Sequence, residues 1–144
     1  MRRLVKLFCL SLSVQFLTSL SAGATNNETS EEPFDWTPVI EAIMMVESEG
    51  NPNAVSGSSV GALQITPIVV RECNYILKAN GSSLRYTLAD RYDVAKSKEM
   101  FLLIQSKYNK ENSVEKAIRS WNGGPRYSKR ATQSYYNKVL RHMR

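Results

Sequence analysis

A carboxylate on the apolar face of a predicted helix is the group in this sequence best suited to proton transfer. The acid is Glu47, and the apolar side chains that precede it at the spacing of one helical face are Val39, Ile40, Ile43 and Met44. Burying an ionised carboxylate without a partner costs several kcal/mol, so burial raises its pKa above the value of about 4.3 for a free glutamate. Glu47 is therefore predicted to serve as a general acid.

Two helices and the segment between them are predicted to surround this acid. The first helix begins with Thr37 as N-cap and Pro38 at its first position, and it ends near Gly50. The second opens in the same way at Thr66-Pro67 and ends at Asn80-Gly81. Residues 51–65 are rich in Ser, Gly and Asn, which predicts a loop or a small β excursion between the two helices.

Three further helices complete the expected domain. One starts near Asp93 and runs to Tyr108, and the next follows Asn112, which with Glu115 resembles a capping box. The last covers about residues 129–142. The folded part, residues 34–144, has about 110 residues, which is enough for one hydrophobic core. The sequence thus predicts a single, mostly α domain.

The N-terminal residues have the form of a secretory signal peptide. A basic start at Arg2, Arg3 and Lys6 precedes an apolar run over residues 7–20 and an Ala-Gly-Ala sequence that ends at Ala24. Polar residues interrupt the run, which makes it a poor membrane span. We expect cleavage after Ala24, so residues 1–24 would be lost, no stable membrane span would remain, and the protein would be periplasmic or secreted. Residues 25–33 are polar and acidic and are expected to form a flexible lead-in.

Charge and cysteine content exclude several classes of function. Loss of residues 1–24 lowers the formal net charge from +6 to about +3, and no dense Lys/Arg block of a nucleic-acid-binding protein remains. Cys9 would leave with the signal peptide, and Cys73 lies among apolar residues at helical spacing, which favours a core residue over a nucleophile. The single histidine, His142, offers neither thiol catalysis nor a zinc site. We therefore expect no metal and no cofactor.

Three blocks of residues occur in a fixed order. They are Glu47-Ser48 followed by Asn51-Pro52, then Gly-Ala-Leu-Gln-Ile-Thr-Pro over residues 61–67, then Trp-Asn-Gly-Gly-Pro over residues 121–125. Together they resemble the catalytic domain of the soluble lytic transglycosylases, a branch of the lysozyme-like superfamily that includes goose-type lysozyme. The similarity spans about Val39 to Val139, and it implies a lysozyme-like fold for the predicted helical domain.

The resemblance also implies an activity and a set of site residues. Glu47 would give its proton to the MurNAc–GlcNAc glycosidic oxygen of peptidoglycan and then act as base on a hydroxyl of the same muramyl sugar, leaving an anhydro-muramyl end. This belongs with the substrate-assisted exceptions to the two-carboxylate rule. The substrate-binding residues would be Ser48, Gly61, Gln64, Trp121, Asn122 and Tyr135. Gln64 offers both a donor and an acceptor to sugar groups, and by the resemblance Asn122 would line the opposite wall of the cleft.

Departures from the family pattern leave three functions open. Trp121 stands where the family has a tyrosine whose hydroxyl lies near the catalytic acid. Either the Trp121 indole takes part of the role of that hydroxyl, or a phenol elsewhere in the chain, such as Tyr135, does. If Asp90 or Asp93 positioned a water, the protein would hydrolyse glycans as goose-type lysozyme does, although both resemble helix caps. A non-catalytic peptidoglycan-binding or assembly protein is the third reading. Secretion or conjugation machinery is a further possible partner.

Overall fold

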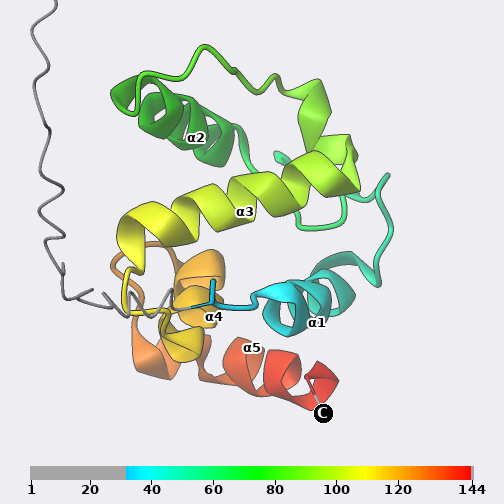
Figure 1. The fold of residues 1–144 in the computed structure, drawn as a ribbon. Coiled ribbons are helices and arrows are strands. Elements are labelled where there is room, and N and C mark those ends of the chain that lie inside the picture. Colours follow the sequence, from blue (N-terminus) through cyan, green and yellow to red (C-terminus); the bar gives the residue numbers. More distant parts are fainter. Residues whose placement is uncertain (1–31, 144) are drawn as a thin grey trace, which may run out of the picture. The chain divides into compact units, whose positions relative to one another are not determined.

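The computed structural model describes residues 32–143, and within them the chain forms five α-helices, one short 3₁₀ helix and one β-hairpin (Figure 1). The predicted signal peptide and most of the predicted lead-in lie outside the described residues. The elements are α1 (Thr37–Ser48), β1 (Val55–Ser56), β2 (Ser59–Val60), α2 (Pro67–Ala79), η1 (Ala89–Tyr92), α3 (Val94–Tyr108), α4 (Val114–Gly123) and α5 (Lys129–His142). The predicted fold class, a mostly α domain with a small β excursion after the first helix, is confirmed. No helix within residues 32–143 is long and apolar enough to cross a membrane.

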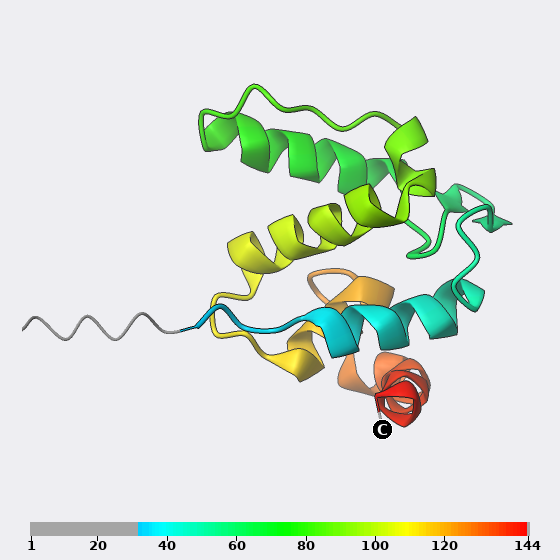
Figure 2. The ribbon, with the colours of Figure 1, turned by 45° about the vertical axis from the view of Figure 1, so that its right-hand side comes forward.

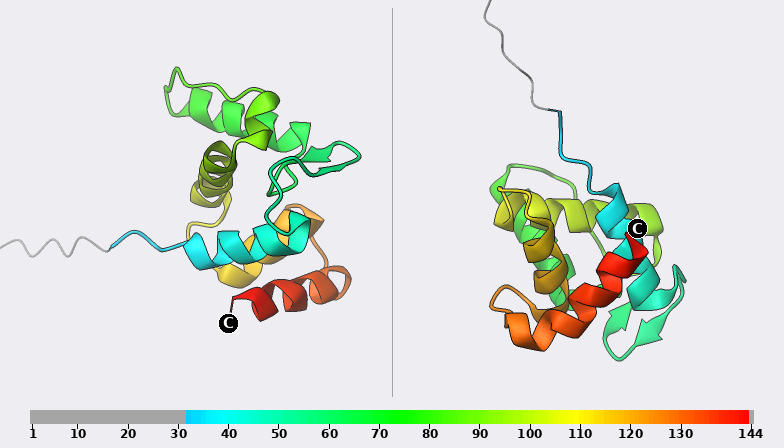
Figure 3. Two further views of the ribbon diagram at one scale, coloured as in Figure 1. Left: turned by 90° about the vertical axis from the view of Figure 1, so that its right-hand side faces the viewer. Right: turned by 90° about the horizontal axis from the view of Figure 1, so that it is seen from below.

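The helices form two groups that share one core. Helices α1, α4 and α5 pack together, and α2 packs on α3 (Figures 1 and 2). The antiparallel hairpin, in which Val55 pairs with Val60, lies beyond the C-terminal end of α1 (Figure 3). The hairpin and the residues that follow it therefore connect α1, in the first group, to α2, in the second. This connection begins two residues after Glu47, the predicted acid.

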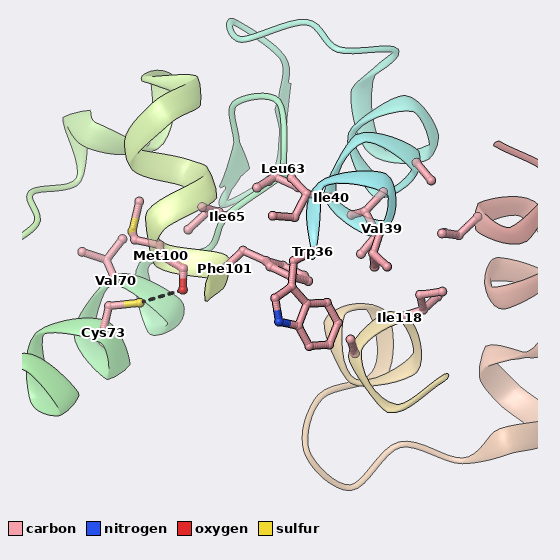
Figure 4. Packing of buried hydrophobic residues seen from close by; sticks show 14 of the residues in the cluster. Trp36, Val39, Ile40, Leu63, Ile65, Val70, Cys73, Met100, Phe101 and Ile118 are labelled. Carbon is pink, nitrogen blue, oxygen red and sulfur yellow. Dashed lines mark hydrogen bonds between the residues drawn. The ribbon is translucent and has the colours of Figure 1, made fainter. Parts of the chain in front are cut away.

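Aromatic rings contact one another within a largely aliphatic core, in which Figure 4 shows Trp36 and Phe101. The ring of Phe101 in α3 lies 5.9 Å from that of Trp36 and 5.0 Å from that of Trp121, measured between centroids. Tilted and edge-on contacts of this kind add about 0.5–1.5 kcal/mol per pair beyond the burial of their area. Phe101 is completely buried and so anchors α3 to the group that contains α1 and α4.

Helix caps agree with the sequence at two positions and differ at two. As predicted, Thr66 Oγ1 accepts from the Val69 amide and Asp93 Oδ1 from the Lys96 amide. The predicted N-cap at Thr37 is wrong, because Thr37 lies inside α1 and donates its amide to Asp35 Oδ1 at 2.9 Å. The predicted cap at Asn112 is also wrong.

The cap of α4 is Ser113, whose Oγ accepts from the Lys116 amide at 3.2 Å. The Asn109 side chain fixes this turn, since its Oδ1 accepts from the Ser113 amide and its Nδ2 donates to the Ser113 carbonyl. Asn112 takes a left-handed conformation with φ of 52°. The cap therefore lies one residue later than predicted, at Ser113, because the Asn109 side chain holds the turn before the helix.

Cys73 is a buried core residue, as predicted. Its Sγ lies 3.6 Å from the Met100 carbonyl oxygen, to which the thiol donates (Figure 4). Burial, with the charge of Glu72 as a lesser cause, raises the pKa of the Cys73 thiol to about 12. The thiol is thus protonated at neutral pH, and this weakens any nucleophilic role.

Candidate active site

Glu47 lies in the last turn of α1 and shares a hydrogen bond with a residue far along the chain. Its side chain is half-buried above the core residues of the same helix. Tyr135 in α5 donates its hydroxyl to Glu47 Oε1 at 2.7 Å. Burial raises the pKa of Glu47, and the hydrogen bond from Tyr135 opposes part of that rise. The carboxyl group therefore tends to hold a proton, as the apolar pattern predicts.

Tyr135 is itself a protonated donor. Burial and the adjacent Glu47 charge both raise the pKa of the Tyr135 phenol. Its position results from the packing of α5 along α1 and α4. A donor fixed in this way favours the carboxylate form of Glu47 once the proton has left, and it does so without giving up a proton of its own.

Ser48 ties the end of α1 to the loop that follows the hairpin. Its Oγ donates to the Ala62 carbonyl at 2.8 Å and approaches the Met44 carbonyl at 3.3 Å. The hydroxyl has one proton, so these contacts commit it to the protein backbone. Ser48 therefore positions residues 61–65 against the helix that carries Glu47.

Gly61 is required by the close approach of the protein's own backbone. A Cβ atom at this position would lie 1.9 Å from the Arg91 carbonyl oxygen, and Gly61 has φ of 80°. The contact excludes a side chain at this position, and the left-handed conformation further favours glycine. Sequence reasoning assigned this glycine to approach by a ligand, whereas the structure places the main chain of Arg91 there.

Gln64 is held in an uncommon conformation with its amide donors engaged. It has φ of 49°, and its Nε2 donates to the Gly61 carbonyl at 2.9 Å and to the Ala54 carbonyl at 3.3 Å. The sequence suggested that this amide would present both a donor and an acceptor. With both donors bound to carbonyls, Oε1 is the group left to receive a hydrogen bond from a ligand.

Arg91 is a buried residue that sequence reasoning missed as a support for this loop. Its guanidinium donates to the carbonyls of Leu88, Ser58 and Ile65 at 2.8, 3.0 and 3.2 Å. Ser97 Oγ in turn donates to the Arg91 carbonyl at 3.0 Å. The sequence drew attention to the acids on either side of Arg91, and nothing local indicates which carbonyls the arginine reaches.

Trp121 also supports this loop, through the Leu63 carbonyl. Its Nε1 donates to the Leu63 carbonyl at 3.1 Å, while its ring packs on Phe101. No hydrogen bond within residues 32–143 joins Trp121 to Glu47. Of the two candidates for the phenol's place beside the acid, Tyr135 is the one in contact with Glu47.

Asn122 is exposed in the last turn of α4, and its side chain makes no hydrogen bond to the described residues. Gly123, also in the helix, allows close packing, because a Cβ there would lie 2.8 Å from both Thr132 Cγ2 and Tyr127 Cβ. Helix α4 ends at Gly123, and the turn that follows begins at Gly124. Asn122 therefore extends from the end of a packed helix and is free to contact a ligand.

The other acids near these segments have separate roles. Asp90 accepts from the Thr87 amide at 2.6 Å and lies 3.7 Å from Lys96 Nζ, and Asp93 caps α3. Glu49 is the exposed C-cap of α1. The shifted pKa of Glu47 has burial and Tyr135 as its causes, and no neighbouring charge contributes within residues 32–143.

Comparison with known proteins gives one match. The family model described as "Transglycosylase SLT domain" matches residues 24–143 and so covers the whole helical domain, including Glu47, Gln64, Asn122 and Tyr135. No curated protein and no solved structure matches the chain. The matched residues include all three sequence blocks and both partners of the Glu47–Tyr135 hydrogen bond. The chain therefore belongs to the transglycosylase SLT domain family, in the lysozyme-like superfamily.

Proposed function

We propose that the protein is a peptidoglycan lytic transglycosylase that cleaves the MurNAc–GlcNAc bond with Glu47 as its general acid and base. Family membership supports transglycosylase activity on peptidoglycan. The observation that carries the catalytic assignment is the half-buried Glu47 carboxyl, with its raised pKa, in contact with the Tyr135 hydroxyl. A group with a pKa moved toward neutrality is matched to proton transfer.

The proposed reaction uses one carboxyl group in both directions. Protonated Glu47 transfers its proton to the glycosidic oxygen as the bond from that oxygen to the muramyl anomeric carbon breaks. The resulting carboxylate takes a proton from a hydroxyl of the same muramyl sugar, whose oxygen bonds to the anomeric carbon. The products are a GlcNAc hydroxyl and an anhydro-muramyl end, and Glu47 regains its proton. Tyr135 stabilises the carboxylate between the two steps.

Residues around Glu47 are proposed to hold the glycan. Gln64 Oε1 would accept a hydrogen bond from a sugar N–H or O–H group, and the exposed Asn122 amide would contact the strand from α4. Ser48, Gly61 and Trp121 act through the loop at residues 61–65, since each contacts its backbone or a residue that holds it. Their substitution would therefore weaken binding by moving Gln64.

The surroundings of Glu47 favour the lyase reaction over hydrolysis. A hydrolase of the two-carboxylate type places a second carboxyl group near the acid, and that charge would itself shift the acid's pKa. Glu47 has no such contribution from the described residues, Asp90 contacts Thr87 and Lys96, and Asp93 caps α3. Tyr135 supplies the phenol that Trp121 lacks, which argues against a site that has lost turnover.

Mass analysis of the products separates these functions. Purified sacculi are incubated with the protein, and the soluble muropeptides are analysed by mass spectrometry before any reduction step. Anhydro-muramyl ends are the result expected of the lyase, whereas ends heavier by one water would assign hydrolysis. Binding to sacculi without soluble products would assign a non-catalytic protein.

Location and partners follow from the proposed substrate. Peptidoglycan lies outside the cytoplasmic membrane, so we propose a periplasmic or secreted protein that loses residues 1–24. N-terminal sequencing of the protein recovered from its source tests the cleavage site. Secretion or conjugation machinery is a proposed partner, because wall cleavage would open a passage for such an assembly. Co-purification of the protein with such an assembly tests this.

A further inference from the structure

Arg119 connects α4 to α5, the helix that carries Tyr135, and it lies outside the three sequence blocks. It lies in α4 with 3% of its surface exposed. Its Nε donates to Glu115 Oε1 at 2.8 Å, its Nη1 to the Lys129 carbonyl at 3.0 Å and to Thr132 Oγ1 at 3.1 Å, and its Nη2 to Gln133 Oε1 at 2.8 Å. The guanidinium carbon also lies 4.2 Å from the centroid of the Tyr136 ring.

The partners of Arg119 in α5 lie on one face of that helix. Lys129, Thr132, Gln133 and Tyr136 are separated by three, four and seven residues, the spacing of a single helical face. One planar guanidinium therefore contacts two successive turns of α5. Contacts at several heights on one face oppose both rotation of α5 about its axis and sliding along it.

The position of the Tyr135 hydroxyl depends on α5 being held against rotation and sliding. It is three residues after Thr132 and immediately before Tyr136, both of which contact Arg119. Its hydroxyl must reach Glu47 Oε1, 2.7 Å away, in a different helix. Hydrogen bonds between oxygens extend over 2.5–3.0 Å and weaken steeply beyond this range. A displacement of α5 by about 1 Å would therefore remove the bond, and misplacement on this scale costs up to about 100-fold in rate.

We infer that Arg119 is a positioning residue for the reaction, one that sets the Tyr135–Glu47 hydrogen bond by fixing the orientation of α5. This rests on the proposed function only for its effect on rate. The effect on Glu47 itself is independent of turnover. Because Tyr135 lowers the pKa of Glu47, loss of its alignment raises that pKa further. A contact that merely stabilised the fold would lower the unfolding temperature and leave the pKa of Glu47 in place.

The test is a double-mutant cycle that measures the pKa of Glu47 directly. The side-chain carboxyl carbon of Glu47 is titrated by NMR in the wild type, Arg119→Lys, Tyr135→Phe and the double variant. Lysine keeps the charge but has no fork to contact Lys129, Thr132 and Gln133 together. We expect Arg119→Lys to raise the pKa of Glu47 in the same direction as Tyr135→Phe, with no further rise in the double variant. The rate of muropeptide release should fall by about ten-fold or more.

Two variants keep the result interpretable. Arg91→Lys alters another buried arginine bound to carbonyls, one that has no hydrogen bond to α5, and should lower stability without moving the pKa of Glu47. Gln133→Ala removes one acceptor from the exposed side of α5 and should give a smaller rise in the same direction, should Arg119→Lys fail to fold. An unchanged pKa in a folded Arg119→Lys or Gln133→Ala variant, or shifts that add in the double variant, would overturn the inference. Activity retained by Glu47→Gln would instead contradict the proposed function and leave this titration unaffected.

Discussion

The hydroxyl of Tyr135 donates a 2.7 Å hydrogen bond to Glu47 Oε1 across 88 positions of the sequence. The bond joins the last turn of α1 to the middle of α5 and gives the raised pKa of Glu47 an opposing contribution. It places a phenol beside the candidate acid although the position expected to carry one is Trp121. Several measurable consequences depend on this contact.

Removal of the Tyr135 hydroxyl should move the alkaline limit of activity to higher pH. A general acid works while protonated, so activity falls as pH rises through the pKa of Glu47. Tyr135→Phe removes the contact that lowers this pKa and keeps the aromatic ring, so the alkaline limb should shift upward while the maximal rate falls. Rates of muropeptide release between pH 4 and 9 measure both effects. An alkaline limb that stays in place or moves down would show that Tyr135 does not act on Glu47.

Trp121 should affect the stability of the loop and leave the acidity of Glu47 unchanged. Trp121→Phe keeps an aromatic ring against Phe101 but removes the hydrogen bond to the Leu63 carbonyl. The loss of one such bond destabilises a protein by about 1 kcal/mol, which chemical denaturation can measure. The alkaline limb of the pH–rate profile should coincide with that of the wild type. A displaced limb would assign Trp121 part of the role given to Tyr135.

Gly61 and Gly57 offer a matched pair of substitutions. Both have positive φ, but a Cβ meets the Arg91 carbonyl at Gly61 and nothing within 4 Å at Gly57. Gly57→Ala should cost only the left-handed conformation, about 1 kcal/mol. Gly61→Ala adds a clash with backbone and should cost more than about 3 kcal/mol. Equal losses in thermal unfolding would mean that the approach of Arg91 is not what requires glycine.

Glu47 should make the protein less stable at neutral pH than at acid pH. A group whose pKa is raised on folding stabilises the native state below its unfolded value, and that contribution is lost as pH rises through the folded pKa. Glutamine has no proton to lose, so Glu47→Gln should unfold at a higher temperature than the wild type at pH 7. The difference should shrink below about pH 4, where both forms are neutral. Calorimetry at the two pH values measures it, and a glutamine variant less stable at pH 7 would contradict the raised pKa.

Much of the fold follows from local signals, and the site depends on contacts that local signals do not contain. Three kinds of feature depend on residues only a few positions apart. They are the apolar faces of α1 and α4, the caps at Thr66 and Asp93, and the bounds of α5. The cap at Ser113 is missed because the Asn109 side chain acts from outside the motif. The contacts of the active site are missed for the same reason, because they form between residues far apart in the sequence.

Family resemblance points to Glu47 and Tyr135 separately, but their contact requires two helices from opposite ends of the domain to pack together. Buried Arg91 and Arg119 are missed for a related reason. An arginine is usually exposed, and its burial becomes acceptable only when the carbonyls and side chains that receive its donors are assembled by the fold.

Product analysis with wild type beside Glu47→Gln tests the central claim most directly. Both proteins are incubated with purified sacculi, and soluble anhydro-muropeptides are quantified by mass spectrometry, with circular dichroism as the control for folding. The wild type should release anhydro-muramyl products, whereas folded Glu47→Gln should bind sacculi and release at least about 100-fold less, because it has no proton to give. Release of the same products by Glu47→Gln at a rate near that of the wild type would contradict Glu47 as the general acid.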